Sequence, residues 1–468
     1  MPATSLARLQ RITLVSIFLI FLPFFEGGLV ATALAFPMLL VAFKPTLRFG
    51  VFIFSNIFFL LFGFSVGWIP VDLQLERLGL IDPILIFGFK CFVVGVMLIV
   101  FYQFLSAVAA LSIFRKYSLI MLMIGYVLLL VFLQVFRNVS YLYLFTSAIF
   151  IFYGKSIWFL AFLILEVRRE GKISKADFLM SLNPFYLSGF LPIPGNLHRW
   201  KGKCLDESFI STQISGLKLI LFLLPLGFLK MTLLKYGNQY QISDAILTYL
   251  ITDFNVVGKV ALANNFYVDS QLGLVDRWLI VTCGFLTYIL DLSLGTGLIV
   301  AKARMMGLPI FRNTYKVASS KTLYEMFLRV HYYYNEIIVH LLVGPSLRLL
   351  WFVNNSRVRV SLAFFLAILS LGWMYHYIKW PSIIISIGPW QFLIQYLEYW
   401  PYFFGLATAA SISIAFEDSA RRSTPLVRLL KLAIYFLIYS ILFALIGSDY
   451  VVIPGKDHLK FVLSLFGS

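Results

Sequence analysis

Long uncharged, apolar stretches recur along the whole chain, and they restrict its fold more than any other feature. Segment 117–136, for example, holds twenty residues without a charged side chain. A helix that crosses a bilayer needs about 20 mostly apolar residues. Only a helix or a closed barrel satisfies all backbone polar groups inside hydrocarbon. The sequence therefore predicts membrane helices.

The composition agrees with this interpretation. Apolar residues make up 61% of the chain and charged residues 13%, about half of the ~25% usual in soluble domains. We predict an all-α, polytopic integral membrane protein with about eleven transmembrane helices around a central cavity or tunnel. We expect one domain over 1–468, because no long polar linker separates the spans. The expected spans are 12–43 (as one long span or two helices), 48–68, 81–113, 117–136, 140–166, 213–233, 274–300, 358–378, 388–416 and 425–447.

Three stretches do not fit a simple pattern of spans. Segment 171–212 includes 184–194 (PFYLSGFLPIP), whose three prolines cannot sit in a regular helix. Segment 240–272 carries aspartates and asparagines among apolar residues, and 309–357 is amphipathic and rich in tyrosine. We expect 171–200 and 309–357 to form broken or tilted helices packed beside the cavity, because lipid-exposed broken backbone is costly.

The first span resembles a signal peptide in part. Arg8 and Arg11 precede an apolar run, and 33–35 (ALA) resembles a signal-peptidase site. However, 26–28 (EGG) interrupts the run, which then continues to Phe43. We expect an uncleaved hairpin or long first span.

The net charge is +17, and the basic residues lie in short clusters between the apolar spans. Such clusters typically contact cytoplasmic lipid headgroups and set the topology. No nucleic-acid-binding motif is present, so we expect no nucleic-acid partner. The three widely spaced cysteines give neither a disulfide framework nor a paired metal site.

Asp291 lies inside an expected span, where a carboxylate costs at least ~2.5 kcal/mol on insertion scales. It should therefore face a partner or a water-filled cavity. A functional role and a helix–helix hydrogen bond, with Ser293 or Tyr288, both fit this position.

Five histidines are present, and His198 and His458 lie in polar stretches typical of a surface. On a helix, His331 would share a face with Asn335, and His340 with Glu336, as an interfacial ion pair. His376 ends an apolar span. Metal-binding spacings such as HExxH are absent, as are the GxSxG elbow, GxGxxG and P-loop motifs. With these motifs absent, the remaining chemical possibility is a site in which a histidine acts as general base and deprotonates an acceptor hydroxyl.

Segment 288–331 resembles the central signature of the membrane-bound O-acyltransferase family. The resemblance rests on 288–293 (YILDLS), 307–311 (GLPIF) and 326–331 (MFLRVH), and 184–194 resembles a further family segment. His376 follows His331 by 45 residues, close to the spacing of the family's two histidines. The family's tryptophans near both histidines are replaced here, which indicates a divergent branch. This branch resembles the membrane subunits of alginate O-acetyltransferase and of teichoic acid D-alanyltransferase.

The resemblance implies acyl transfer from a thioester to a hydroxyl of an envelope polysaccharide or lipid. His376 would be the general base and His331 its partner in the same cavity. The binding or tunnel residues would be Asp291, Ser293, Arg329, Asn335 and Tyr375. The resemblance also implies that no cofactor is bound and that an acyl-coenzyme A or acyl-carrier thioester is the co-substrate. The other implied partners are membrane lipids and a periplasmic acyltransferase protein, and the implied location is the bacterial inner membrane.

Two other classes of protein share these features. A transporter or flippase for a lipid-linked glycan would also carry an intramembrane aspartate and histidine. Inverted sequence repeats would favour this interpretation, and none is visible in the sequence. In a non-catalytic membrane subunit, Asp291, His331 and His376 would be packing residues.

Overall fold

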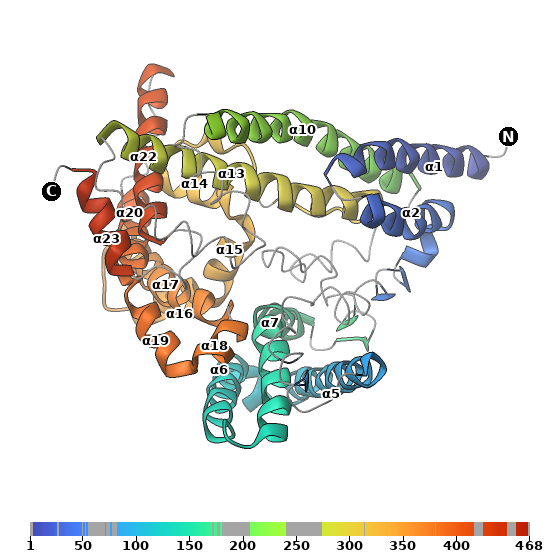
Figure 1. The fold of residues 1–468 in the computed structure, drawn as a ribbon, viewed down its shortest axis with the longest axis horizontal. Coiled ribbons are helices and arrows are strands. Elements are labelled where there is room, and N and C mark those ends of the chain that lie inside the picture. The colour runs from blue at the N-terminus through green and yellow to red at the C-terminus, as the bar shows by residue number, and fades with distance from the viewer. Residues whose placement is uncertain are drawn as a thin grey trace. The chain divides into compact units, whose positions relative to one another are not determined.

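The computed structural model shows only helices as regular elements in the part of the chain that it describes (Figure 1). The described residues are 3–25, 28–48, 50–51, 53–54, 71, 75–76, 82–170, 173–175, 178–179, 206–239, 274–312, 314–379, 381–415, 425–446 and 455–466. They belong to two compact units. The first comprises Met1–Leu221, Leu298–Phe311 and Ile378–Pro389, and the second comprises Phe222–Gly297, Arg312–Tyr377 and Trp390–Ser468.

Among the residues that the structure describes, four helices are long and apolar enough to cross a membrane, which indicates a membrane protein. They are Ser5–Phe24, Pro83–Ala110, Lys116–Val135 and Ser208–Lys230. Each overlaps an expected span, so the prediction of apolar helices there is confirmed. Segments 48–68, 171–212 and 240–272 lie wholly or largely outside the described residues.

In the first unit, the expected segment 12–43 forms two helices. Helix α1 (Ala3–Phe21) ends at a short 3-10 turn, Leu22–Phe24, which contains Pro23, and α2 (Gly28–Phe43) follows. The guanidinium of Arg11 on α1 is buried and donates to the carbonyl of Ala42 on α2 at 2.9 Å. This bond satisfies a buried charged group between two apolar helices.

Three long helices of the first unit pack side by side (Figure 1): α5 (Pro83–Ala110), α6 (Ser112–Val135) and α7 (Ser140–Glu170). Phe101 of α5 stacks on Phe152 of α7, with ring centroids 5.8 Å apart. The Tyr153 hydroxyl donates to the carbonyl of Leu122 on α6 at 2.7 Å. The apolar stretches thus bury their aromatic side chains against one another and satisfy the polar end of the tyrosine. The short helix α18 (Pro381–Ile387) also packs on α7.

Helices α10 (Asp206–Gln239) and α13 (Leu274–Met305) form an antiparallel pair. Each helix has one part in the first unit and one part in the second, and the two helices contact each other within each unit. In the first unit, the Gln213 amide donates to the Met305 carbonyl at 2.9 Å. In the second, Leu223 covers Gly297 so closely that a Cβ added there would lie 2.8 Å from a leucine methyl. The pair is therefore held by a polar contact and by the close approach that a small residue allows.

The second unit contains the broken helices expected over 309–357. Helix α14 (Leu323–Val330) is followed by α15 (Tyr332–Ile337), a π-helix (Ile338–Val343) and α16 (Gly344–Leu349). The helical backbone is interrupted at His331, whereas α15, the π-helix and α16 follow one another without a gap from Tyr332 to Leu349. The expected break in this stretch is confirmed at His331, whereas its packing beside a central cavity stays a prediction.

Helix α17 (Ser356–Lys379) occupies the expected span 358–378, and α22 (Pro425–Ile446) that of 425–447. The single long helix expected over 388–416 is wrong: α19 (Pro389–Leu397) and α20 (Trp400–Ala415) replace it. Helix α19 begins at Pro389, and α20 begins one residue before Pro401. Proline fits the first turn of a helix but interrupts a helix interior. Helix α20 packs on α14 and α22, and α23 (Gly455–Ser464) packs on α22.

The chain turns sharply after α13, and Gly307 makes this turn possible. Its φ of +78° lies in the left-handed region, and a Cβ added there would overlap the ring of Phe209. The Arg304 guanidinium donates to the Ile310 carbonyl at 2.7 Å and to the Ser215 hydroxyl at 2.8 Å. The turn is thereby fixed to both helices of the pair.

Replacing Gly307 by alanine should destabilise the protein substantially. The left-handed backbone costs an alanine ~1–2 kcal/mol, and overpacking against Phe209 costs a further ~1–3 kcal/mol. Gly295→Ala, inside α13, is the matched control, because a Cβ added there would meet no neighbouring side chain within 4 Å. Thermal unfolding in detergent should show a clearly lower midpoint for Gly307→Ala only. Equal midpoints for the two variants would contradict the role of Gly307.

Candidate functional site

His331 lies at the break between two helices of the second unit. It caps the C-terminus of α14 and precedes α15, with φ −129° and ψ 60°. Its backbone N–H donates to Phe327 and its carbonyl accepts from Asn335, both at 3.0 Å. The break therefore leaves the backbone of His331 hydrogen-bonded on both sides while its ring projects from a junction.

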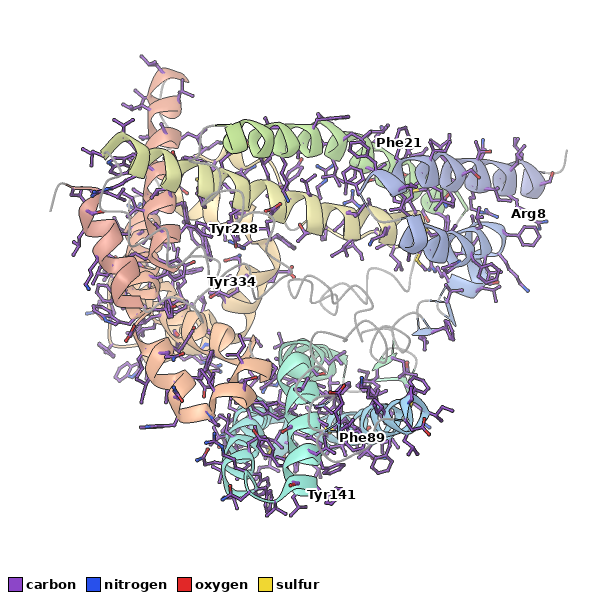
Figure 2. All side chains as sticks on the ribbon, in the orientation of Figure 1. Arg8, Phe21, Phe89, Tyr141, Tyr288 and Tyr334 are labelled. Atoms are coloured by element: carbon purple, nitrogen blue, oxygen red, sulfur yellow. The ribbon has the colours of Figure 1, made fainter. Side chains whose placement is uncertain are left out.

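The His331 ring faces Tyr288 of α13. The Tyr288 hydroxyl lies 3.4 Å from Nε2, a long hydrogen bond in which the phenol donates when the imidazole carries its proton on Nδ1. Phe327 and Tyr334 complete the surroundings, with centroids 5.9 and 6.3 Å from the imidazole. Figure 2 labels Tyr288 on α13 and Tyr334 on α15. His331 is thus a partly buried imidazole that has the Tyr288 phenol beside it and aromatic rings around it.

Aromatic residues of α13 and α22 form the wall behind Tyr288. The Tyr288 ring lies 4.5 Å from that of Phe443 and 6.4 Å from that of Phe285, centroid to centroid. Phe285 in turn stacks on Tyr439 at 5.9 Å. This packing restricts the orientation of Tyr288 and hence the direction of its hydroxyl.

Asn335 and His331 occupy successive turns, as their spacing predicts. The Asn335 side-chain oxygen accepts from the Tyr324 hydroxyl at 3.3 Å. The Tyr324 N–H donates to Ser413 of α20 at 2.9 Å. Asn335 is therefore connected to α14 and, through Tyr324, to the packed helices of the second unit.

Arg329 forms a clamp at the surface of α14. Its guanidinium pairs with Glu325 at 2.6 Å and donates to the Lys316 carbonyl at 3.1 Å and the Ser319 hydroxyl at 2.9 Å. Partial burial favours the neutral carboxyl, but hydrogen bonds from the Lys321 N–H and from Arg329 outweigh it and lower the pKa of Glu325. Arg329 thus holds the loop before α14 in place.

Asp291 forms an ion pair with Lys230 of α10, and both side chains are about a quarter exposed (23% and 26%). Asp291 lies one helical turn after Tyr288, on the same side of α13. Ser293 is partly exposed and lies ~200° around the helix from Asp291. Asp291 and Tyr288 therefore lie on the same side of α13, and Ser293 points to the opposite side.

His376 and Tyr375 lie on the last turns of α17, but their side chains fall outside the described part of the structure. The neighbouring Tyr377 packs on Phe392 of α19, with centroids 5.2 Å apart. His340 lies in the π-helix, a rare element that is frequent at functional sites. Its expected partner Glu336 accepts from the Tyr332 hydroxyl at 2.6 Å, and the pairing with His340 stays a prediction.

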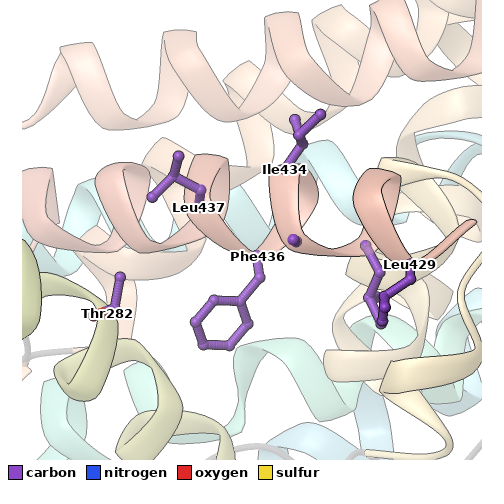
Figure 3. Close-up of a pocket in the computed structure, with 7 residues that line it drawn as sticks. Thr282, Leu429, Ile434, Phe436 and Leu437 are labelled. Atoms are coloured by element: carbon purple, nitrogen blue, oxygen red, sulfur yellow. The ribbon is translucent and has the colours of Figure 1, made fainter. Parts of the chain in front are cut away.

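An apolar groove of about 540 Å³ opens between α13 and α22. Figure 3 shows Thr282 of α13 opposite Leu429, Ile434, Phe436 and Leu437 of α22. Phe436 also packs on Phe285, with centroids 5.1 Å apart, and Phe285 stacks on Tyr288. One aromatic layer therefore separates the groove from the Tyr288–His331 pair.

This arrangement can move a proton and accommodate a hydrocarbon chain. A neutral imidazole next to a phenol can accept a proton from a hydroxyl that binds beside it. Among the described residues, no group of three or more His, Cys, Asp and Glu is placed to hold a metal ion.

Two contributors to this site were not predicted as such, Tyr288 as the partner of His331 and Lys230 as the partner of Asp291. A search for cations near the ends of apolar runs would have selected Lys230, because an intramembrane carboxylate needs a partner. No sequence signal links Tyr288 to a histidine 43 positions away.

Comparison with known proteins gives no family assignment: no family model matches the sequence, and no protein of curated function is significantly similar to it.

The ion pair between α10 and α13 predicts coupled effects of substitution. Asp291→Leu or Lys230→Met leaves one charge unpaired and should cost about 2 kcal/mol of unfolding free energy. This is below the ~3–5 kcal/mol of a fully buried pair, because both side chains are partly exposed. The double variant Lys230→Met/Asp291→Leu should recover most of the loss.

The free energy of unfolding in detergent is measured for all three variants. The control is Lys218→Met, which replaces an exposed lysine of α10. Its unfolding free energy should stay within ~0.5 kcal/mol of wild type. Additive losses in the double variant would mean that the two side chains are not coupled.

Proposed function

We propose that the protein is a membrane-bound O-acyltransferase. It transfers an acyl group from a thioester donor to a hydroxyl of a cell-envelope polysaccharide or lipid. The observation that carries the proposal is the placement of His331 at a helix break, with the Tyr288 hydroxyl 3.4 Å from its ring. A partly buried imidazole with a phenol beside it suits a general base or its positioning partner.

In this proposal His376 is the general base and His331 its partner. His376 removes the proton from the acceptor hydroxyl, the hydroxyl oxygen attacks the thioester carbonyl, and the thiolate leaves and takes up a proton. His331 and Asn335 orient donor or acceptor. The groove beside Phe436 supports the proposal, because an apolar groove suits a hydrocarbon chain.

The proposal extends to the fold and the location. About eleven transmembrane helices would surround a central cavity in which His331 and His376 meet. The donor, an acyl-coenzyme A or acyl-carrier thioester, would enter from the cytoplasmic face of a bacterial inner membrane. The acceptor would arrive from the other face or from the lipid, with a periplasmic acyltransferase as partner. The four apolar helices are consistent with such a multi-pass protein.

Substitution of the histidines tests the proposal. His376→Ala and His331→Ala should each lower acyl transfer by ~10²–10⁴. His340→Ala, the matched control, should have a smaller effect. The measurement is transfer of label from a radioactive acyl thioester to envelope components in membranes that contain each variant, with thermal unfolding as a check of folding.

Each other outcome has a defined meaning. Equal losses in His340→Ala and His376→Ala would show that the base is assigned to the wrong residue. Full activity of His376→Ala would remove the mechanism. No labelled product with the wild-type protein would favour the transporter or the non-catalytic subunit.

A further inference from the structure

Two cations surround an exposed tyrosine in the loop before α14. The guanidinium carbon of Arg312 lies 5.8 Å from the Tyr315 ring centroid, and the Lys316 ammonium lies 5.2 Å from it. Arg312 also lies 5.3 Å from the Phe222 ring of α10. The Tyr315 side chain is 46% exposed, so this cation–tyrosine cluster is accessible to a ligand.

The cluster has an excess of positive charge. In the described part of the chain, no carboxylate forms a salt bridge with Arg312 or Lys316. The nearby Glu325 is already paired with Arg329. Lys316, which hydrogen-bonds the phenol, and the charges of Arg312 and Arg329 lower the pKa of Tyr315. An anion would therefore be stabilised here.

Several contacts fix the backbone at Lys316. Lys316 has a φ of +47°, the only positive φ of a residue other than glycine in the described chain. Its carbonyl accepts from the Ser319 N–H at 3.0 Å, the Ser319 hydroxyl at 2.8 Å and Arg329 at 3.1 Å. A left-handed lysine is costly and persists where several contacts fix it, which is common at ligand-binding positions.

The same loop is attached to the backbone directly before His331. The Tyr315 N–H donates to the Arg329 carbonyl at 2.8 Å, and the Thr314 hydroxyl to the Val330 carbonyl at 3.0 Å. These bonds satisfy two carbonyls at the end of α14. A ligand bound to Arg312 and Lys316 is thus held at a fixed position relative to the candidate histidine.

We propose that Arg312 and Lys316, on either side of Tyr315 in the sequence, form a binding site for a phosphate group. Arginine binds phosphate through two parallel hydrogen bonds, and lysine contributes a compact charge. The phosphate belongs either to a coenzyme A donor or to the headgroup of an anionic lipid. The first source rests on the proposed function, since it places the donor next to His331, and the second does not.

The test is equilibrium binding to the full-length protein. In the first arm, the protein is in phosphatidylcholine nanodiscs and the probe is coenzyme A, with phosphate-free pantetheine as its control. In the second arm, the probe is phosphatidylglycerol, titrated into detergent-solubilised protein and counted by native mass spectrometry. The variant is Arg312→Gln/Lys316→Asn, because asparagine tolerates a left-handed backbone. The matched control, Lys218→Gln/Arg348→Gln, removes two exposed charges elsewhere.

Loss of two charge-assisted contacts should weaken phosphate binding at least ~10-fold in the Arg312/Lys316 variant. The control should stay within ~2-fold, and pantetheine should not distinguish the proteins. Weakened coenzyme A binding assigns the site to the donor. Weakened phosphatidylglycerol binding with unchanged coenzyme A binding supports the site and rejects the donor. Wild-type affinity for both probes overturns the proposal. Because neither arm measures acyl transfer, failure of the proposed function remains distinguishable.

Discussion

A polar side chain on an apolar helix must meet a partner, and α13 carries the polar groups on which the second unit depends. Its Asp291 pairs with Lys230, and its Tyr288 reaches His331. Its Thr282 hydroxyl donates to a carbonyl of the preceding turn. Because each group needs a partner in low dielectric, these contacts fix α10 on one side of α13 and the broken helices on another. The candidate site is a consequence of that requirement.

The broken stretch follows the same rule. Short helices leave N–H and carbonyl groups without intrahelical partners. Here the loop that begins at Arg312 supplies them, since Tyr315 and Thr314 donate to the end of α14. The same contacts place two cations beside the segment that carries His331. One loop therefore both hydrogen-bonds the free carbonyl groups at the end of α14 and carries the candidate ligand site.

Much of this architecture could be predicted from the sequence, because long apolar runs and proline positions are local signals. The helices at 83–110 and 112–135 and the broken 309–357 follow from them. The division of 388–416 at its prolines was missed, because its apolar composition concealed the break. The partners of Asp291 and His331 could not be predicted, since pairing between residues 61 and 43 positions apart depends on helix packing. The eleven spans and the family resemblance remain predictions.

The account depends most on the meeting of His331 and His376 in one site. Cysteines at these two positions, in a chain whose Cys91, Cys204 and Cys283 are replaced by serine, allow a direct test. A bifunctional maleimide shorter than ~15 Å, the reach of a relay through a few waters, should join them. A single-ended maleimide confirms that each cysteine is accessible. Efficient cross-linking within one chain is the predicted result. Two accessible cysteines that do not cross-link would contradict the account.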